Sequence, residues 1–428
     1  EAAYVEQRVR LKWTVGDENV KAVAFFEYDY SAWGDASGSS NSANGFFNAS
    51  GVWVANTASG AARNTGGGHG ADRSNQETKN LYVWFKVPNT SVDFTVGMQN
   101  QTDAYQGLLF GADDMAGIFA NFKVEPVTFT LGWAKWYENN IQKADDLDIY
   151  VATARLAPTK DVKLGVSFYY FQDDTQAPGP TTPGQLPQNS VAGLNNRKHG
   201  YTPGIDFAAN AGPVGLSGFF LYQFGKIDFL TNTATVKDAD IAGFAVDLRG
   251  DVNLGPGKGF LEGLYVSGSD DPASKYKSIW TASDPTSSPG GNSAFVRLDY
   301  SILMGNADDI NTNSCLIGCA APAASQSPGN GGRGMWTVGA GYSMKLSDKV
   351  MGKVGAGYLS ATKMLKTDNS NRGKYMGTEV NANVNYNIYK GLDVGLYAAY
   401  AWLGDFFKYQ SGTSWDTPDP AYDIHWRL

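Results

Sequence analysis

The sequence predicts an all-β fold, a transmembrane antiparallel β-barrel of about 16–18 strands with short periplasmic turns and long extracellular loops. The main observation is a two-residue alternation of polar and apolar side chains, which Asn381, Asn383 and Asn385 show between apolar neighbours. Short turns and long polar loops alternate between such segments. The chain also holds 51 glycines and 13% aromatic residues, which suit turns and the two interfaces of a membrane barrel.

Length, charge and cysteine content narrow the class of protein. The chain has 428 residues, 42% of them hydrophobic, and it contains no run of about 18 apolar residues that could form a transmembrane helix. A net charge of −8 argues against a nucleic-acid partner. Cysteine occurs only twice, which suits export through an oxidising compartment. We therefore expect the bacterial outer membrane, with its lipid and lipopolysaccharide, as the location.

The first two strands are expected over residues 4–13 and 20–33, with a tight turn at residues 16–19. Each strand has an apolar face and a charged face. The basic residues of the first strand could select ions, or they could pair with acidic residues across the strands, and both interpretations stay open. A barrel would turn the charged faces inward, and these faces carry Arg8, Arg10, Lys12, Glu27 and Asp29.

Later strands are expected in pairs joined by short turns, and the whole chain, residues 1–428, is expected to form one domain. The first and the last visible strand would both descend towards the periplasm, and two such strands cannot close an antiparallel barrel. We therefore expect one more strand upstream of Glu1, which raises the count from about 17 to about 18. The expected pairs are 78–87 with 92–102, 115–124 with 127–138, 147–156 with 162–172, and others that meet near Pro213, Pro256, Asp348 and Lys390.

Residues 270–333 are the least regular part of the chain. They could form one long external excursion, or an extra strand pair over 274–281 and 294–303, and strand character is favoured around 295–303. Cys315 and Cys319 predict a small disulfide in an external loop, with free thiols or a metal as the alternatives.

Polar residues at alternate positions also extend the interior lining into the second half of the chain. The charged ones predict a wall network, and the amides predict a polar lining without catalytic geometry. His69 lies in a GGGHG loop that lacks the Lys-Ser/Thr of a phosphate-binding loop, and no nucleophile motif stands out. We expect no enzyme activity, no cofactor and no metal. The lining residues are Asp247, Arg249, Asp251, Glu379, Asn381, Asn383 and Asn385.

Several longer segments carry a family resemblance. They are EAAYVEQRVRLKW with VAFFEYDYSAWGD, KNLYVWFKVPNTSVDFTVGMQN with GADDMAGIFANFK, and EGLYVSGSDD with DYSILMGN and WTVGAGYSMKLSDKVMGKVGAGYL. Taken in this order along much of the chain, they resemble the outer-membrane homotrimeric porins of sulfate-reducing bacteria and their relatives. The resemblance implies a trimeric, water-filled diffusion channel and further sequence upstream of Glu1.

The resemblance to porins also suggests roles for two long loops. Residues 103–114 would be the inward loop that narrows the pore, with an ordinary exposed turn as the alternative. Residues 34–76 would latch a neighbouring subunit of the trimer, with a solvated loop as the alternative. Facing charges across the narrowing would set the ion selectivity. The expected acidic side is Asp103, Asp113 and Asp114, and the expected basic side is Arg8, Arg10 and Lys12.

The expected function is passive diffusion of small hydrophilic solutes and ions through a pore narrowed by an inward loop. A second possibility is a substrate-specific channel for small acidic solutes or sugars, to which Tyr169 and Phe171 could contribute an aromatic track. A third is a barrel without transport, either an enzyme or a sheath around an electron carrier. Single-channel conductance separates the three possibilities.

Overall fold

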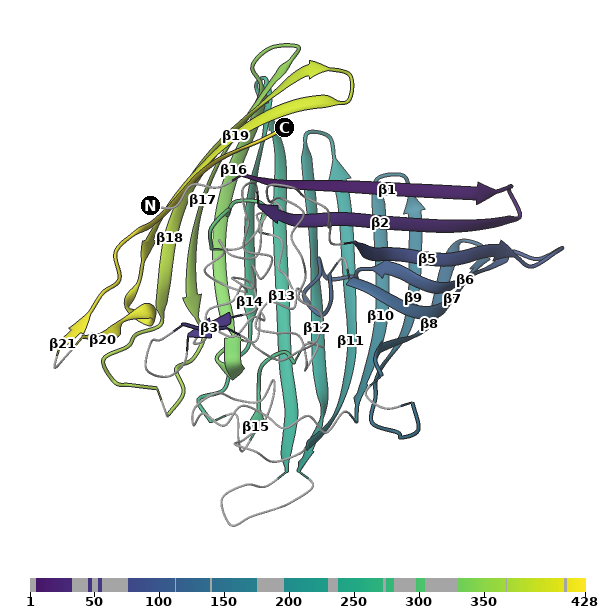
Figure 1. The fold of residues 1–428 in the computed structure, drawn as a ribbon, viewed down its shortest axis with the longest axis horizontal. Helices are drawn as coiled ribbons and strands as arrows, with labels where there is room; N and C mark the ends of the chain where they lie inside the picture. Colours follow the sequence, from purple (N-terminus) through teal and green to yellow (C-terminus); the bar gives the residue numbers. More distant parts are fainter. Residues whose placement is uncertain are drawn as a thin grey trace. The chain divides into compact units, whose positions relative to one another are not determined.

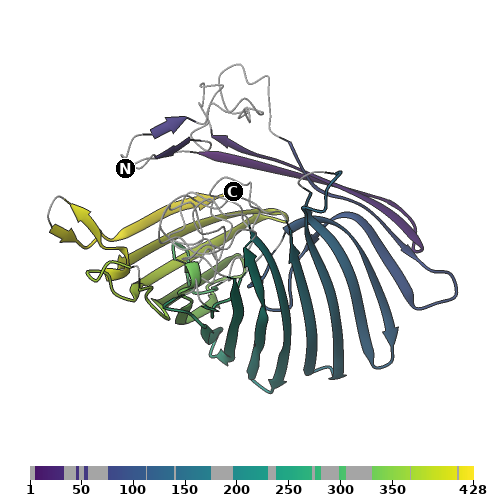
Figure 2. The same ribbon diagram turned by 90° about the horizontal axis from the view of Figure 1, so that it is seen from below.

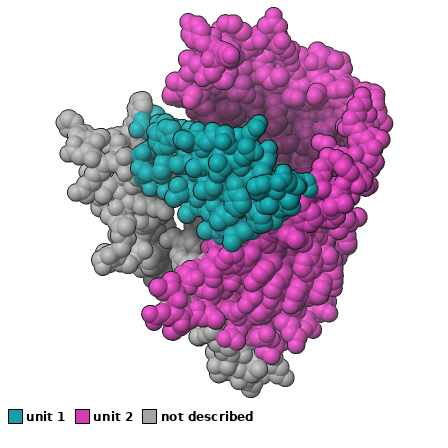
Figure 3. Space-filling view, turned by 90° about the vertical axis from the view of Figure 1, so that its right-hand side faces the viewer, with its two compact units in different colours: residues 1–100, 114–120 teal, residues 101–113, 121–428 magenta. Residues whose placement is uncertain are grey.

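The computed structural model describes most of the chain in two compact units (Figure 3). Unit 1 comprises residues 1–100 and 114–120, and unit 2 comprises residues 101–113 and 121–428. The described residues are 5–32, 45–47, 53–55, 76–111, 113–138, 141–174, 196–229, 238–271, 275–280, 298–304, 330–366, 368–411 and 414–428.

Unit 1 is built from antiparallel strands that the alternation of charged and apolar residues predicts. In the β1–β2 pair, Arg10 lies opposite Glu27 and Lys12 lies opposite Phe25. β2 also pairs with β5, and β5 pairs with β6. The strands are β1 (Glu6–Gly16), β2 (Val20–Ala32), β5 (Glu77–Lys86), β6 (Val92–Gln101), the part of β7 (Asp113–Val124) within the unit, and the small pair β3 (Gly45–Phe47) and β4 (Trp53–Ala55).

Unit 2 contains a curved sheet whose strands lie side by side (Figures 1 and 2). From β8 to β14 each strand pairs antiparallel with the next, β14 pairs with β16, and the order continues through β19 to β22. The strands are β8 (Val127–Tyr137), β9 (Leu147–Thr159), β10 (Val162–Asp173), β11 (Asn196–Ala211), β12 (Val214–Phe229), β13 (Ala239–Leu254), β14 (Gly257–Val266), β16 (Met335–Lys345), β17 (Val350–Ala361), β18 (Tyr375–Tyr389), β19 (Leu392–Leu403) and β22 (Ala421–Arg427).

Shorter elements complete unit 2. A two-residue strand, β15 (Lys275–Tyr276), runs parallel to β13. β20 (Tyr409–Ser411) pairs with β21 (Ser414–Asp416). Two single-turn 3₁₀ helices cover Asn330–Gly332 and Asp405–Phe407. Within the described part of the chain, no helix has the length and apolar character needed to cross a membrane.

The predicted all-β antiparallel architecture and its strand number are confirmed. Over the described residues, 18 strands belong to one sheet. Part of the irregular region differs from the prediction, because residues 298–304 contain no strand. The strand character expected around 295–303 is therefore wrong for these residues. Cys315 and Cys319 lie outside the described residues, and their disulfide stays a prediction.

The turn after β1 shows why the sequence places a glycine there. Gly16 has a φ of 134°, and a Cβ atom at this position would collide with the carbonyl oxygen of Val20. The side chain of Asp17 then accepts the backbone N–H groups of Asn19 at 2.8 Å and Val20 at 3.1 Å. These bonds fix a short reversal, and the β1–β2 register follows from it.

The two faces of the unit 2 sheet differ in chemistry. In β13, Phe244, Val246 and Leu248 are 37%, 39% and 52% exposed, whereas Ala245 and Asp247 between them are buried. β18 repeats the pattern, because its asparagines lie on the face opposite its exposed valines. We call the apolar exposed face the outer face and the polar face the inner face.

Aromatic rings stack along the outer face. Tyr170 stacks on Tyr201 with ring centroids 4.6 Å apart, and Tyr150 stacks on Tyr170 at 5.5 Å. Tyr201 continues the row to Phe224 at 5.4 Å. Such a row links four neighbouring strands by cross-strand pairs.

Candidate functional site

Residues 103–110 form a compact loop that is closed by its own first carboxylate. The buried side chain of Asp103 accepts four backbone N–H groups, and its own N–H donates to the carbonyl of Phe110 at 3.0 Å. A carboxylate that satisfies so many donors determines the conformation of the loop. The four donors are Tyr105 at 2.6 Å, Gly107 at 3.0 Å, Leu109 at 2.5 Å and Phe110 at 2.8 Å.

The closed loop packs on the inner face of unit 2. The ring of Tyr105 meets Phe219 of β12 at 5.4 Å, and the ring of Phe110 meets Tyr169 of β10 at 5.4 Å and Trp136 of β8 at 6.0 Å. Two polar contacts add to this packing. The hydroxyl of Tyr169 accepts the N–H of Ala104 at 2.9 Å, and Gln106 donates to Asp247 of β13 at 3.3 Å. Four strands therefore seat the loop.

Asp103 points into its own loop, with 7% of its surface exposed. Burial raises the pKa of Asp103 to about 6, while the backbone hydrogen bonds act in the opposite direction. The geometry assigns it a role in shaping the loop, which differs from the solute-facing charge that the sequence suggested. The side chain of Asp113 lies outside the described residues, and a pore constriction by residues 103–114 stays a prediction.

A second segment, residues 275–280, also folds onto the inner face. Gln223 of β12 exchanges two hydrogen bonds with Trp280, donating to its carbonyl at 2.8 Å and accepting its N–H at 2.6 Å. The indole ring lies 5.6 Å from the ring of Phe171. Lys198 of β11 lies 5.7 Å from the same indole and forms a buried ion pair with Asp173 at 3.0 Å.

A third segment, residues 298–304, is held by Glu379 of β18. This carboxylate is fully buried and accepts the hydroxyl of Ser301 at 2.7 Å. Asn381 joins the two parts, because its amide donates to Glu379 at 2.9 Å and to the carbonyl of Tyr300 at 2.7 Å. Three consecutive backbone N–H groups also donate to Glu379, those of Ile302 at 2.5 Å, Leu303 at 3.0 Å and Met304 at 2.8 Å.

The ring of Tyr300 occupies a slot made by missing side chains. A Cβ atom on Gly339 of β16 or on Gly357 of β17 would collide with this ring, and one on Gly355 would lie 3.1 Å from the Cα of Tyr300. The hydroxyl of Tyr300 is paired with Thr337 at 2.7 Å. Glycine is thus required at these wall positions by the close approach of the third segment.

The sequence predicts a wall network of Asp247, Arg249 and Asp251, and the structure shows Arg249 within a cluster of carboxylates that includes Asp251. The role of this cluster as a pore lining stays a prediction. The guanidinium bonds Asp251 at 3.0 Å, Glu262 of β14 at 3.2 Å and Asp299 of the third segment at 2.6 Å. It also lies 4.0 Å from the centre of the Phe260 ring. The wall and the third segment therefore meet at one arginine.

The three asparagines predicted to line the pore lie on the inner face of β18, and their role as a pore lining stays a prediction. Asn385 donates to Asn383 at 3.2 Å and accepts the hydroxyl of Tyr397 at 3.0 Å. Asn381 and Asn383 are buried, whereas Val380 on the opposite face is exposed.

The basic residues of unit 1 take part in a chain of alternating charges. Glu27 is buried and pairs with Arg10, with Arg8 at 3.8 Å and with Lys79 of β5 at 3.8 Å. Lys79 continues to Asp114 at 2.9 Å. Arg8 and Arg10 are thus engaged in cross-strand pairs, the second of the two interpretations given above. An additional role in ion selection stays a prediction.

Two further residues predicted for the interior, Lys12 and Asp29, have no described place in this chain of alternating charges. The ammonium group of Lys12 lies 5.9 Å from the ring centre of Phe25, the residue opposite it in the register. Asp29 lies in β2, and its side chain is outside the described residues.

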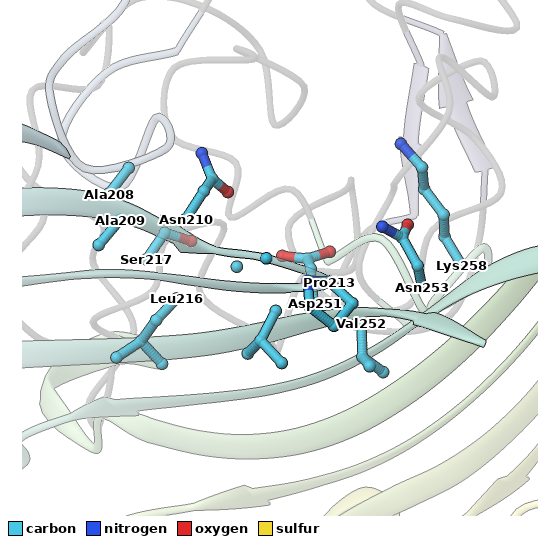
Figure 4. Close-up of a pocket in the computed structure, with 13 residues that line it drawn as sticks. Ala208, Ala209, Asn210, Pro213, Leu216, Ser217, Asp251, Val252, Asn253 and Lys258 are labelled. Carbon is cyan, nitrogen blue, oxygen red and sulfur yellow. The ribbon is translucent and has the colours of Figure 1, made fainter. Parts of the chain in front are cut away.

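A polar recess of 340 Å³ lies at the turn end of β11 to β14. Figure 4 shows Asn210, Asp251 and Asn253 on one side of these strands and Leu216 and Val252 on the other. The recess therefore continues the polar inner face. In the described part of the chain, no group of three His, Cys, Asp or Glu side chains could hold a metal ion.

Sequence reasoning missed Gln223, Tyr300, Asp299 and Lys79. One signal was present for Tyr300, because Gly339 faces Gly357 and Gly341 faces Gly355 across the β16–β17 pair. Facing glycines on a buried face indicate close approach by another segment. The other three residues carry no local signal, because their partners lie far away in the sequence.

Comparisons with known proteins give distant likenesses only. No protein family model matches the chain, and no curated protein matches it. It is similar to the solved structure of Pseudomonas aeruginosa OccK1 (OpdK), with a TM-score of 0.47 and 13% identity over 98% of this chain and 91% of that one. P. aeruginosa OccK5 (OpdH) gives 0.45 and 10% over 99% and 94%.

A third likeness is to a loop-deletion mutant of OmpT, an outer membrane protein of Vibrio cholerae, with a TM-score of 0.41 and 11% identity over 93% of this chain and 98% of that one. Likenesses at this level carry no argument about function. The resemblance to porins of sulfate-reducing bacteria therefore stays a prediction.

Proposed function

We propose that this protein is a bacterial outer-membrane channel, a barrel through which small hydrophilic solutes and ions diffuse. The observation that carries the proposal is the contrast between the two faces of unit 2. Apolar side chains stay exposed on the outer face, and amides, carboxylates and a guanidinium occupy the inner face. A folded protein in water rarely leaves so much apolar surface uncovered, whereas lipid covers it at no cost.

The length of the apolar band supports the same assignment. The outer-face positions of β13 from Ala242 to Leu254 hold no charged residue. Twelve residue steps at about 3.3 Å span about 40 Å along the strand. A strand tilted by about 45° then covers about 28 Å of membrane height, close to the apolar band of known membrane barrels at about 25 Å. Charges at Lys226 and Asp240 lie beyond the band, in strand parts that would reach the interface.

A substrate-specific channel is the second candidate, favoured by one observation. Three segments, residues 103–110, 275–280 and 298–304, pack on the inner face of unit 2 and occupy space that an open pore would leave to water. A narrowed pore can select solutes by size and by charge. The alternatives without transport, an enzyme or a sheath, would leave the membrane without a conducting path.

Reconstitution into planar lipid bilayers tests the channel directly. We expect ohmic single-channel currents in potassium chloride for the general channel. Small currents that are blocked by one organic acid or sugar would favour the substrate-specific channel. Membranes that stay insulating, although the protein is inserted and folded, would overturn both.

The resemblance to homotrimeric porins extends the proposal to assembly. Three copies associate in outer-membrane lipid, in contact with lipopolysaccharide, and residues 34–76 latch one subunit to the next. Currents that close in three equal steps, together with a cross-linked trimer in membranes, are the expected results. A single closing step and a monomer after cross-linking would contradict the trimer and leave the channel intact.

A further inference from the structure

We propose that residues 298–304 form a second narrowing element of the channel, seated by Glu379 and Tyr300, and that Asp299 on this element biases passage towards cations. The proposal rests on the channel function above and adds to it the charge class of the preferred solute. It also assigns a role to a segment for which the sequence leaves open an external excursion or an extra strand pair.

Apart from Asn381 in its own strand, the described residues that donate hydrogen bonds to the carboxylate of Glu379 all belong to this segment. This carboxylate projects from the wall, is fully buried, and takes donors from Ser301 to Met304 together with Asn381. A buried carboxylate is costly unless its oxygens are satisfied, so the wall residue and the segment stabilise each other. If the segment left the wall, Glu379 would keep only Asn381 of its described hydrogen-bond donors.

The slot for Tyr300 is a second, chemically independent anchor. It depends on shape, because Gly339 and Gly357 leave the space that the ring fills. It also depends on the Thr337 hydroxyl, 2.7 Å from that of Tyr300. Two anchors of different kind on β16, β17 and β18 fix both the position and the orientation of a short segment without strand pairing.

This element is seated separately from the loop of residues 103–110. That loop packs on β8, β10 and β12, whereas the 298–304 element packs on β16 to β18. Among the contacts of the described residues, the two meet the same strand at β13, where Asp247 accepts a hydrogen bond from Gln106 and Arg249 forms an ion pair with Asp299. Removal of one should therefore leave the other in place.

The charge exposed beside the element is predominantly negative. The side chains of Asp299 and Asp251 are 48% and 45% exposed, whereas that of Arg249 is 18% exposed and that of Glu262 is 1% exposed. The guanidinium is covered by its carboxylate partners and by the ring of Phe260. A solute that passes this point meets carboxylate oxygens first, which attract cations and repel anions.

The charge is tested by Asp299→Asn, with Asp348→Asn as the matched control in an exposed turn. Reversal potentials in a potassium chloride gradient measure the cation-to-anion permeability ratio. We expect this ratio to fall about fivefold in Asp299→Asn, because one unit charge at about 8 Å in water changes the cation and the anion permeability by about twofold each, in opposite directions. The control should not change it. A ratio equal to that of the wild type would remove Asp299 from the filter.

The seat is tested by Gly357→Ala, whose methyl group would collide with the Tyr300 ring. Gly250→Ala, which adds a methyl group to open space, is the matched control. We expect a larger single-channel conductance in Gly357→Ala and faster hydrogen exchange at Ile302 to Met304, with neither change in the control. Both variants should keep the circular dichroism of the wild type.

The possible outcomes separate this proposal from the channel itself. A conducting, folded Gly357→Ala variant with unchanged conductance and unchanged exchange at Ile302 to Met304 overturns the narrowing element. A wild-type protein that does not conduct overturns the channel function and the cation bias with it. Glu379→Gln gives an independent check of the seat, because it should accelerate exchange at the same three amides.

Discussion

Gln223 and the main chain of Trp280 are joined by two hydrogen bonds, of 2.8 Å and 2.6 Å, across 57 residues of sequence. The side-chain amide forms the two hydrogen bonds that a peptide group of a neighbouring strand would form, because it donates to the carbonyl and accepts the N–H of Trp280. Both groups of Trp280 are buried, so they depend on this side chain for their hydrogen bonds.

We predict that Gln223→Leu releases residues 275–280 from the wall. Leucine is similar in size but leaves the N–H and the carbonyl of Trp280 unsatisfied, at a cost of about 1–3 kcal/mol each. The fluorescence of Trp280 should shift to longer wavelength, and its amide should exchange faster. Gln142→Leu, at an exposed loop position, is the control. Unchanged exchange at Trp280 would show that ring packing alone holds the segment.

The loop closed by Asp103 should respond to pH. Its pKa is about 6 in the folded protein and near 3.8 when unfolded. A raised pKa means that the fold favours the protonated acid, so the stabilisation is complete below about pH 3.8 and is lost as the pH rises through about 6. The difference in unfolding free energy between wild type and Asp103→Asn should fall by about 2 kcal/mol from pH 4 to pH 7.

Thermal unfolding in detergent micelles across this pH range measures the difference for Asp103. Subtracting the unfolding free energy of the Asn variant removes the contribution of all other titrating groups, because these groups are present in both proteins. A difference that increases with pH would mean that the four N–H donors outweigh burial and hold the pKa of Asp103 low.

A charge on the outer face should disturb insertion, whereas the same charge on the inner face should not. Leu248 is 52% exposed on the outer face of β13, and Ser217 lines the polar recess. We predict that Leu248→Lys destabilises the protein in lipid vesicles by about 2–4 kcal/mol, and that Ser217→Lys costs much less. Urea titration in vesicles provides the measurement. Equal costs would contradict the assignment of the two faces.

Removal of the central anion of unit 1 should shift its charge balance. Glu27 is buried between Arg8, Arg10 and Lys79, so Glu27→Gln leaves three cations close together without their shared partner. We predict a lower unfolding temperature and a reversal potential shifted towards anions. Glu18→Gln in the exposed β1–β2 turn serves as the control. A stable variant with an unshifted potential would exclude these cations from the permeation path.

The strands were predictable from the sequence because their signal is local. The strand expected over residues 20–33 is observed as Val20–Ala32, since each polar residue there sits between apolar neighbours. The polar positions of β18 could be predicted for the same reason. Asp247 and Arg249 could be assigned to the interior, but their partners Gln106 and Asp299 could not.

The infolded segments could not be predicted, because their contacts are long-range. Ser301 and Glu379 are 78 residues apart, and neither has a neighbour that suggests the other. Asp103 shows a different limit of the sequence. An acidic residue in a polar loop predicts a surface charge, whereas here the backbone folds around it and uses both oxygens. The loop conformation decides whether Asp103 is a surface charge or a buried hydrogen-bond acceptor, and this conformation leaves no periodic pattern in the sequence.

The run of opposite charges from Arg8 through Glu27 and Lys79 to Asp114 has a practical consequence for electrophysiology. Mobile ions screen the exposed charges of this run, the guanidinium groups of Arg8 and Arg10 with 36% and 41% of the side chain exposed, more than the buried carboxylate of Glu27. The screening distance shrinks from about 10 Å at 0.1 M to about 3 Å at 1 M salt. Recordings in molar electrolyte, which is chosen because it gives large currents, would therefore reduce the effect of these exposed charges on ion selectivity. Dilute electrolyte is the condition in which its discrimination between ions should be greatest.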